Sequence, residues 1–103
     1  MEFKNVTLIK EANVYDNGKV SSRVFYLESK EKKTLGFMLA GEYTFNTNEE
    51  ELMEVLNGEM KAKLPSEETF KSYKKGESFS VPANSSFDVI VAEFADYCCS
   101  YIK

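Results

Sequence analysis

The sequence has no histidine, and it contains only two cysteines and one arginine. The cysteines are neighbours, Cys98 and Cys99, so on a strand they would point to opposite faces and could be joined only in a strained ring. A closed zinc site needs four ligands, which this pair cannot supply in a chain without imidazoles. We therefore expect two reduced, buried thiols and no metal held by them.

Long apolar runs are also missing. The first ten residues, MEFKNVTLIK, have neither a seven-residue apolar run nor a small-residue cleavage site, and no window approaches a membrane-spanning length. We expect a cytoplasmic protein without a membrane partner. The net charge of -4 and the single arginine, Arg23, leave no basic stripe, so no nucleic-acid partner is expected either.

A chain of 103 residues has room for one hydrophobic core, and we expect a single domain over residues 1–103. Apolar residues recur at every second position in several segments, as they do in half-buried strands. The acidic stretch after Thr47 could begin a helix, with Thr47 or Asn48 as its cap, but too few residues separate it from the next strand. We therefore expect an all-β domain, either a small sandwich or a barrel.

Turn residues separate the expected strands. Asp16-Asn17-Gly18 and Asn57-Gly58 both predict tight hairpins, because Asn and Gly tolerate positive φ. Gly41 predicts a break between two strands, and Pro65 ends another. The charged run from Lys30 to Lys33 is typical of a solvated turn.

Two spacings match the motif skeleton of the cupins. Glu51 stands seven residues before Gly58, and Gly76 stands six residues before Pro82. In cupins the first motif also carries a His-x-His pair ahead of its glutamate, and the second motif later supplies a third histidine. Without these imidazoles the cluster offers at most one carboxylate and some neutral oxygens, so we predict no catalytic metal and no other cofactor.

The empty histidine positions can be placed in two registers. With three residues between the second position and Glu51, they fall at Phe45 and Thr47; with four, they fall at Thr44 and Asn46. A slip of one residue turns every side chain to the other face of the sheet, so the two registers predict different cavity walls. The third position falls at Phe87 in both.

The chain more specifically resembles the pyrimidine/purine nucleoside phosphorylases, a family of small bacterial cupins. Segments in the family's order carry the resemblance: residues 10–24, 33–47, 51–65, 76–87 and 96–101. The resemblance implies a single-domain cupin, a jelly-roll β-barrel. It also implies a pentosyltransferase, which converts purine and pyrimidine nucleosides and orthophosphate to free base and ribose 1-phosphate; with the histidines missing, we expect it to be metal-independent. Small cupins usually pair, so a homodimer is expected.

A nucleoside site could be built around Glu51. Its carboxylate would accept hydrogen bonds from the ribose hydroxyls as the catalytic group, or else it is a solvated member of the acidic run that begins at Glu49. Tyr43, Phe45 and Phe87 would offer apolar faces to the base or ribose, or else they are core aromatics. Neutral polar side chains around the same cavity would add donors and acceptors: Thr44, Asn46 and Thr47.

Orthophosphate needs cations and N–H groups, and both occur close together near Arg23. Arg23 could grip phosphate with two parallel hydrogen bonds, and Lys19 could act as a point charge. On a strand, Lys19, Ser21 and Arg23 share one face while Val20 and Ser22 share the other, so only one set can line a cavity. Alternatively, this segment is the polar outer face of an edge strand.

Two other classes of protein remain open, because a fold does not fix a function. A non-catalytic cupin would bind a nucleoside or another small ligand saturably and release no base. A scaffold or interaction protein would show no effect of such a ligand on stability. A true site filled at a hundred times its dissociation constant would add about 2.7 kcal/mol to the free energy of unfolding.

Overall fold

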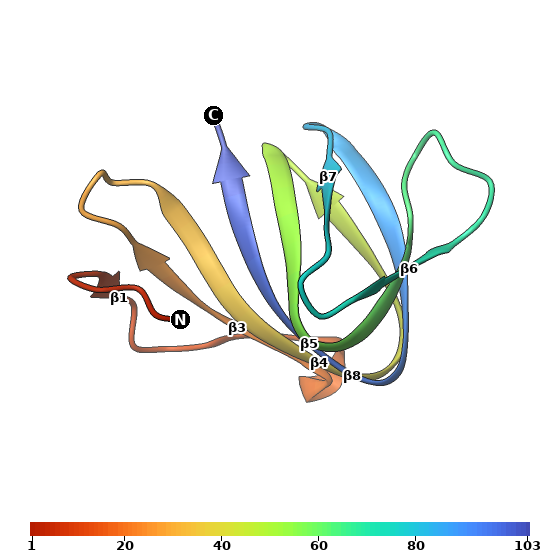
Figure 1. Ribbon diagram of the computed structural model, residues 1–103, viewed down its shortest axis with the longest axis horizontal. Coiled ribbons are helices and arrows are strands. Elements are labelled where there is room, and N and C mark those ends of the chain that lie inside the picture. Colours follow the sequence, from red (N-terminus) through yellow and green to blue (C-terminus); the bar gives the residue numbers. More distant parts are fainter.

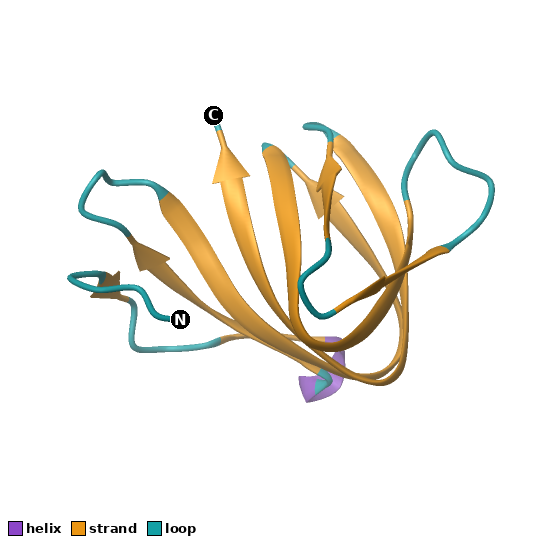
Figure 2. Cartoon of the chain, in the orientation of Figure 1, coloured by secondary structure: helices purple, strands orange, loops and turns teal.

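The computed structural model describes residues 1–103 and is built from strands, with one 3-10 turn and no α-helix (Figure 2). The all-β prediction is therefore confirmed, and a helix after Thr47 is absent. The elements are β1 (Thr7–Leu8), β2 (Asn13–Tyr15), η1 (Asp16–Gly18), β3 (Val20–Tyr26), β4 (Lys32–Thr47), β5 (Glu50–Lys63), β6 (Lys71–Lys74), β7 (Ser78–Val81) and β8 (Ser85–Ile102). No helix in the structure is long and apolar enough to span a membrane.

One antiparallel sheet contains every strand, in the order β1-β3-β4-β8-β5-β6, with β2 paired to β3 and β7 paired to β5. The long strand β8 is its centre, because β8 pairs with β4 along one edge and with β5 along the other. The three longest strands bend together, so the sheet folds over on itself (Figure 1). It does not close, so the expected barrel is an open, strongly curved sheet with one concave face.

The long strands bend at glycines, where the hydrogen-bonding register between paired strands shifts. The β4–β8 register shifts between Leu39 and Gly41, and the β5–β8 register shifts on both sides of Gly58. The predicted hairpin at Asn57-Gly58 is thus wrong: β5 continues through it, and the preference of this pair for positive φ serves a bulge instead. The break predicted at Gly41 is likewise a bulge within one continuous strand.

Gly58 is the position where the bend most depends on glycine. Its φ is +78°, and a Cβ at this position would lie 2.3 Å from the carbonyl oxygen of Phe94 on β8. We expect Gly58→Ala to lower the free energy of unfolding by several kcal/mol, because backbone strain of about 1–3 kcal/mol is joined by a clash with main chain. Urea unfolding followed by circular dichroism measures this change.

Gly18 provides the matched control for that experiment. Its φ is +89°, but a Cβ there would have no atom within 4 Å. Gly18→Ala should therefore show the strain alone, about 1–2 kcal/mol. Equal losses in the two variants would contradict the importance of the close approach between Gly58 and Phe94. Gly18 itself ends the turn between β2 and β3, which confirms the hairpin predicted at Asp16-Asn17-Gly18.

The core lies on the concave face, where alternation along the strands collects the apolar side chains. Phe79, Val81, Phe87, Val89 and Val91 are all buried, as their period of two predicts. Their neighbours in the sequence face outward or are only partly covered. Side chains from the two halves of the bent sheet face one another across the concave side. A cavity remains where they do not fill the space between the two halves.

Candidate active site

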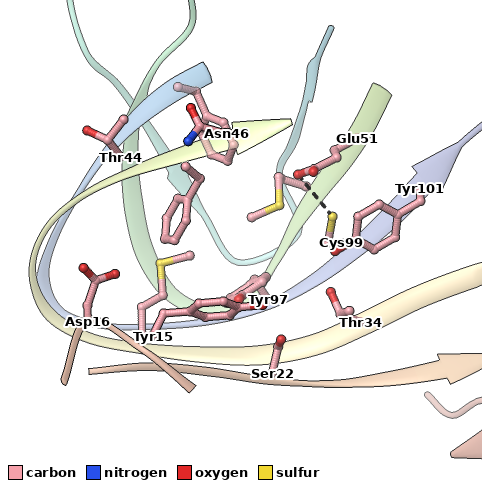
Figure 3. Close-up of a pocket in the computed structure, with 14 residues that line it drawn as sticks. Tyr15, Asp16, Ser22, Thr34, Thr44, Asn46, Glu51, Tyr97, Cys99 and Tyr101 are labelled. Carbon is pink, nitrogen blue, oxygen red and sulfur yellow. Dashed lines mark hydrogen bonds between the residues drawn. The ribbon is translucent and has the colours of Figure 1, made fainter. Parts of the chain in front are cut away.

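A cavity of about 510 Å³ opens on the concave face of the sheet (Figure 3). Its apolar wall consists of Met38, Phe45, Met53 and Phe87. Its polar and aromatic groups are Ser22, Thr34, Glu51, Tyr97, Cys99 and Tyr101, and its edge is formed by Tyr15, Asp16, Thr44 and Asn46. Small-molecule sites commonly measure about 300–1,000 Å³, so the cavity suits a ligand of nucleoside size.

Strand pairing brings the polar groups of this cavity together from distant parts of the sequence. Glu51 on β5 lies opposite Tyr101 on β8, one row above the pair of Met53 and Cys99. Cys99 in turn lies opposite Thr34 on β4. Because paired residues on one face of a sheet have neighbouring side chains, these rows place a carboxylate, a thiol and two hydroxyls in one corner.

Glu51 is the carboxylate that enters the cavity from this corner. The thiol of Cys99 donates a hydrogen bond to Glu51 Oε1, with 3.5 Å between sulfur and oxygen (Figure 3). Burial raises the pKa of Glu51, and the negative charge of Glu49 adds to the increase; the Cys99 hydrogen bond and the charge of Lys32 oppose it. The prediction that Glu51 faces inward agrees with this placement.

The groups around Glu51 stay protonated and act as neutral donors. Burial raises the pKa of Tyr97, Cys99 and Tyr101 well above their ordinary values, and the nearby Glu51 charge raises each further. Tyr97 lies across from Gly36, where a Cβ would come within 2.4 Å of the ring, so this glycine leaves the space that the phenol occupies. This corner of the cavity therefore offers one carboxylate, that of Glu51, surrounded by O–H and S–H groups.

Both cysteines are free and buried, as predicted, and they point to opposite faces of β8. Cys99 lines the cavity, whereas Cys98 is covered on the convex face. Burial raises the pKa of Cys98 to about 11, so it too remains a thiol.

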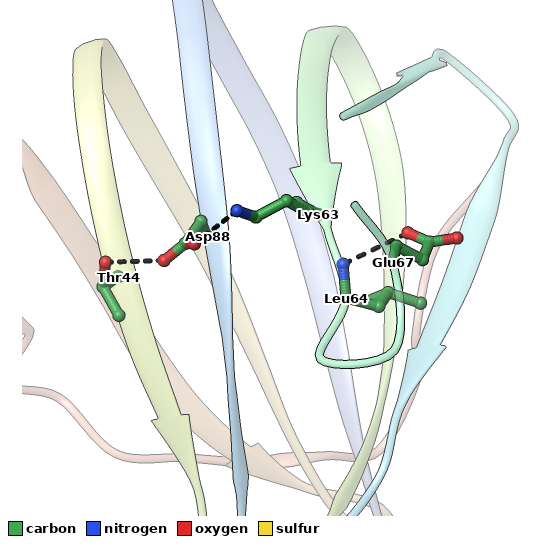
Figure 4. A network of polar contacts seen from close by, with 5 residues as sticks. All are labelled: Thr44, Lys63, Leu64, Glu67 and Asp88. Carbon is green, nitrogen blue, oxygen red and sulfur yellow. Dashed lines mark hydrogen bonds and ion pairs between the residues drawn. The ribbon is translucent and has the colours of Figure 1, made fainter. Parts of the chain in front are cut away.

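The structure selects the first of the two predicted registers. Phe45 and Thr47 point to the concave face, while Thr44 and Asn46 are both exposed and reach only the edge of the cavity. Thr44 donates a hydrogen bond to Asp88, 2.8 Å away, and Lys63 completes this outer chain across three strands at 3.7 Å from Asp88 (Figure 4). Thr44 is therefore held on the convex side.

Of the predicted aromatic residues, two line the cavity and one does not. The rings of Phe45 and Phe87 lie 5.6 Å apart and form one continuous wall. Tyr43 is a core residue instead, only 5% exposed, and its hydroxyl donates to the Leu39 carbonyl oxygen at 2.7 Å. Thr47 is also structural, because its hydroxyl donates to the Pro82 carbonyl at 2.7 Å.

The predicted phosphate ligands divide by strand face. Ser22 is buried and lines the cavity, in register with Gly36. Lys19 and Arg23 are exposed and do not line it, and Arg23 Nε donates to the Lys10 carbonyl oxygen at 3.3 Å on the other face. The expectation that Lys19 and Arg23 line the cavity is thus corrected, because Val20 and Ser22 occupy the inward positions of β3.

Several cavity residues have no counterpart among the predicted ones. Tyr97, Cys99 and Tyr101 alternate along the last strand, and this alternation is the only sequence signal for them. Asp16 adds a second carboxylate at the edge. Nowhere do three or more carboxylate, thiol or imidazole groups gather as a metal site would require, and metal independence stays a prediction.

The concave sheet and its cavity define a cupin-like protein. A cupin of the RmlC type from Shewanella frigidimarina superimposes with a TM-score of 0.71 over 95% of this chain and 89% of its own, at 13% identity. A protein of unknown function from Acinetobacter sp. ADP1 superimposes with a TM-score of 0.95 at 37% identity, over 98% of both chains. The first likeness, together with the curved all-β sheet, establishes the predicted cupin fold.

Sequence comparison places the chain in one cupin family. The model of the pyrimidine/purine nucleoside phosphorylase family matches residues 10–101. A relative from Clostridioides difficile with that name is 62% identical over 101 residues, which are 98% of this chain and 96% of the relative. The chain belongs to the pyrimidine/purine nucleoside phosphorylase family.

Proposed function

We propose that this protein is a nucleoside phosphorylase of broad specificity. It would transfer the ribosyl group of purine and pyrimidine nucleosides to orthophosphate, giving free base and α-D-ribose 1-phosphate without a metal. Family membership supports this activity, and the observation that carries the site is that Glu51 and the aromatic pair of Phe45 and Phe87 line one cavity.

The two sides of the cavity suit the two parts of a nucleoside. Phe45 and Phe87 present aromatic faces on which any base can stack, because every base has a π-face. Glu51 is an acceptor for the ribose hydroxyls, and Tyr97 and Tyr101 are neutral donors beside it. Stacking contacts the flat face of a base and makes no hydrogen bonds to the edge groups by which bases differ. A site that binds bases by stacking therefore supports broad specificity.

The reaction needs charge stabilisation more than proton transfer. An oxygen of hydrogen phosphate forms a bond to C1′ of the ribose as the C1′–N bond breaks, and the electron pair of the C1′–N bond stays on the nitrogen of the base. The proton of hydrogen phosphate is transferred to the departing base, so the base leaves neutral and ribose 1-phosphate keeps two negative charges. The sugar passes through an oxocarbenium-like state, which the ionised Glu51 stabilises by its charge and its grip on the ribose. Phosphate is already an anion, so positioning can supply much of the acceleration.

One feature favours the non-catalytic alternative: no lysine or arginine is among the residues that line the cavity. A cupin that only binds a nucleoside would need no cation. We test the two functions with purified protein and uridine, adenosine or inosine, and we separate free base by chromatography. Base release that requires phosphate and persists with a chelator supports the phosphorylase. If nucleosides bind saturably but no free base is released from any of them, the protein is a non-catalytic nucleoside-binding cupin instead.

Cys99 should tune the activity through Glu51. Its hydrogen bond lowers the pKa of Glu51, so Cys99→Ala should let that pKa rise further. If ionised Glu51 is the active form, activity falls as pH drops through its pKa, and the acid limb of kcat/KM should move to higher pH in the variant. Cys98→Ala, on the opposite face, should leave the limb unchanged. An unmoved limb in a folded Cys99→Ala protein would show that the thiol does not act on Glu51.

We also propose that residues 1–103 act as one domain in a homodimer. The convex face exposes apolar side chains that a second copy could cover: Leu35, Phe37, Leu39 and Leu56. Phe37 stacks on Phe94 within this patch, with 5.6 Å between ring centres. Sedimentation velocity at micromolar concentration tests the pairing, and a monomer there would reject it.

Two free thiols suit a reducing cytoplasm, where we place the protein.

A further inference from the structure

The cavity does not contain the cation that orthophosphate would need. Its lining includes two carboxylates, Glu51 and Asp16, and no lysine or arginine. A phosphate dianion placed among these groups alone would be repelled and stripped of water without compensation. If the protein is the phosphorylase proposed above, on which this inference rests, a cation must reach the ribose from beside the cavity.

A second hollow of about 380 Å³ adjoins the cavity at Tyr101, which lines both. It lies between the β3–β4 turn and the end of β8. Three lysines line it: Lys30, Lys32 and Lys103. The one carboxylate side chain there, that of Glu31, accepts a hydrogen bond from the Ser29 hydroxyl at 3.2 Å. The hollow is therefore cationic where the cavity is acidic.

Lys32 is the lysine that reaches from this hollow toward the cavity. It is half-buried on the concave face of β4, two residues before the cavity residue Thr34. Its ammonium nitrogen lies 4.5 Å from the centre of the Tyr101 ring. Such a contact with an aromatic face holds the ammonium over the concave side instead of leaving it free in solvent. The charged run predicted as a solvated turn therefore ends earlier, because Lys32 and Lys33 already belong to β4.

Lys32, Tyr101 and Glu51 follow one another across three neighbouring strands. Tyr101 on β8 lies between Lys32 on β4 and its paired residue Glu51 on β5. Strands lie about 4.8 Å apart, so the main chains of Lys32 and Glu51 are roughly 10 Å apart. The ammonium group of Lys32 lies over the Tyr101 ring, and its positive charge lowers the pKa of Glu51. A ribose held by Glu51 would have its open side within reach of an anion held by Lys32.

The other cations near this site are turned away or already in use. Lys33 faces the convex side and donates to the Ser100 hydroxyl at 2.6 Å. Arg23 is exposed on the outer side of β3, and Lys19 is exposed in the turn just before β3. Three lysines lie over aromatic rings, and only Lys32 lies over a ring that lines the cavity.

We propose that the hollow beside Tyr101 is the orthophosphate subsite, with Lys32 as its principal ligand and Lys30 as a second positive charge at the turn. Phosphate bound there faces C1′ of a ribose held by Glu51, and Tyr101 separates the two charged groups. The site would accept the tetrahedral oxyanions phosphate and arsenate.

The test compares Lys32→Gln with Arg23→Gln in steady-state phosphorolysis of uridine, with phosphate and uridine varied in turn. A charge-assisted contact to phosphate predicts that Lys32→Gln raises the KM for phosphate about ten- to hundred-fold. The KM for uridine should stay within about twofold of the wild-type value. Lys32→Arg should restore most of the loss, and Arg23→Gln should match the wild type. An unchanged KM for phosphate in Lys32→Gln would overturn the subsite and leave the proposed function standing.

A binding measurement separates failure of the subsite from failure of the proposed function. If the wild type releases no base, titration with inorganic phosphate followed by calorimetry still tests the hollow. Phosphate binding that is lost in Lys32→Gln and kept in Arg23→Gln would support the anion site even then. Equal phosphate binding by all three proteins, or none by the wild type, would overturn it.

Discussion

Replacing Glu51 with glutamine should lower kcat/KM for phosphorolysis about 10²- to 10³-fold, the usual loss when a preorganised electrostatic group is removed. A glutamine at this position would keep the size of the side chain and one acceptor, so a nucleoside should still bind. The substitution removes the negative charge that would stabilise the positively charged sugar in the transition state. The loss should therefore appear mainly in kcat, as expected for an interaction strongest at the transition state.

The same variant should fold at least as well as the wild type at alkaline pH. Burial raises the pKa of Glu51, so ionising it is harder in the folded protein than in the unfolded chain. Stability attached to this group is therefore present at low pH and lost as pH rises through the folded pKa. Glutamine removes that dependence, so urea unfolding at about pH 8, above the ordinary glutamate pKa, should show no loss for Glu51→Gln.

Glu50→Gln is the matched control for these experiments. Glu50 is the neighbouring residue on β5, it is exposed, and it points to the other face. Its replacement removes the same charge from the chain without touching the cavity. Activity reduced equally in both variants would mean that net charge matters and that the Glu51 carboxylate has no special role. Full activity of folded Glu51→Gln would contradict its catalytic role outright.

The second large effect is expected at the aromatic wall. Phe45→Ala should raise the KM for nucleosides about five- to hundred-fold, because stacking contributes about 1–3 kcal/mol per base. The increase should be similar for uridine and adenosine, because the phenyl ring of Phe45 stacks on the flat face of a base and does not contact the edge groups by which bases differ. Phe45 is half-buried against Phe87, so thermal unfolding must first establish a temperature at which the variant is folded.

Phe70→Ala separates stacking from a general loss of aromatic packing. Phe70 is exposed, precedes β6 and does not line the cavity. Its replacement should leave the KM for every nucleoside unchanged. If Phe45→Ala and Phe70→Ala gave the same kinetics, base binding at the Phe45–Phe87 wall would be rejected. An increase for purines alone would instead show that the wall discriminates between bases.

Alternation of residues made the faces of individual strands predictable. The period of two from Phe79 to Val91 identifies a buried row correctly, and Glu51 lies at the inward position that its motif spacing predicts. Such local patterns depend only on the pleat of one strand. They do not state how strands are aligned, and alignment is what places Phe45 opposite Phe87 and excludes Thr44 from the interior.

The residues that could not be predicted are those that meet through long-range pairing. Cys99 reaches Glu51 only because β5 and β8 pair along most of their length, although the two residues are 48 apart in sequence. Alternation along the strand predicts that Arg23 and Ser22 point to opposite faces, but it does not predict which of them faces the cavity. The pairing of β3 with β4 places Ser22 on the cavity side. Lys32 was obscured by its charged neighbours, whose composition is that of a turn although β4 has already begun.

The outcome at Asn57-Gly58 has a related cause. This pair favours positive φ, which both a hairpin and a bulge can use. Nothing within a few residues distinguishes the two outcomes. The choice follows from β8, which is long enough to pair with β5 on both sides of the glycine. Bending rather than reversal of β5 is what curves the sheet around the cavity.

Phosphorus NMR of the reaction mixture shows directly whether the Glu51 cavity carries out phosphorolysis. Wild-type protein, uridine and inorganic phosphate are mixed with a chelator, and the spectrum is followed in parallel with Glu51→Gln and Glu50→Gln. We expect a ribose 1-phosphate resonance to grow as the phosphate signal falls, at similar rates for the wild type and Glu50→Gln and far more slowly for Glu51→Gln. A spectrum in which inorganic phosphate alone persists with folded wild-type protein, or one in which all three proteins form product equally fast, would contradict it.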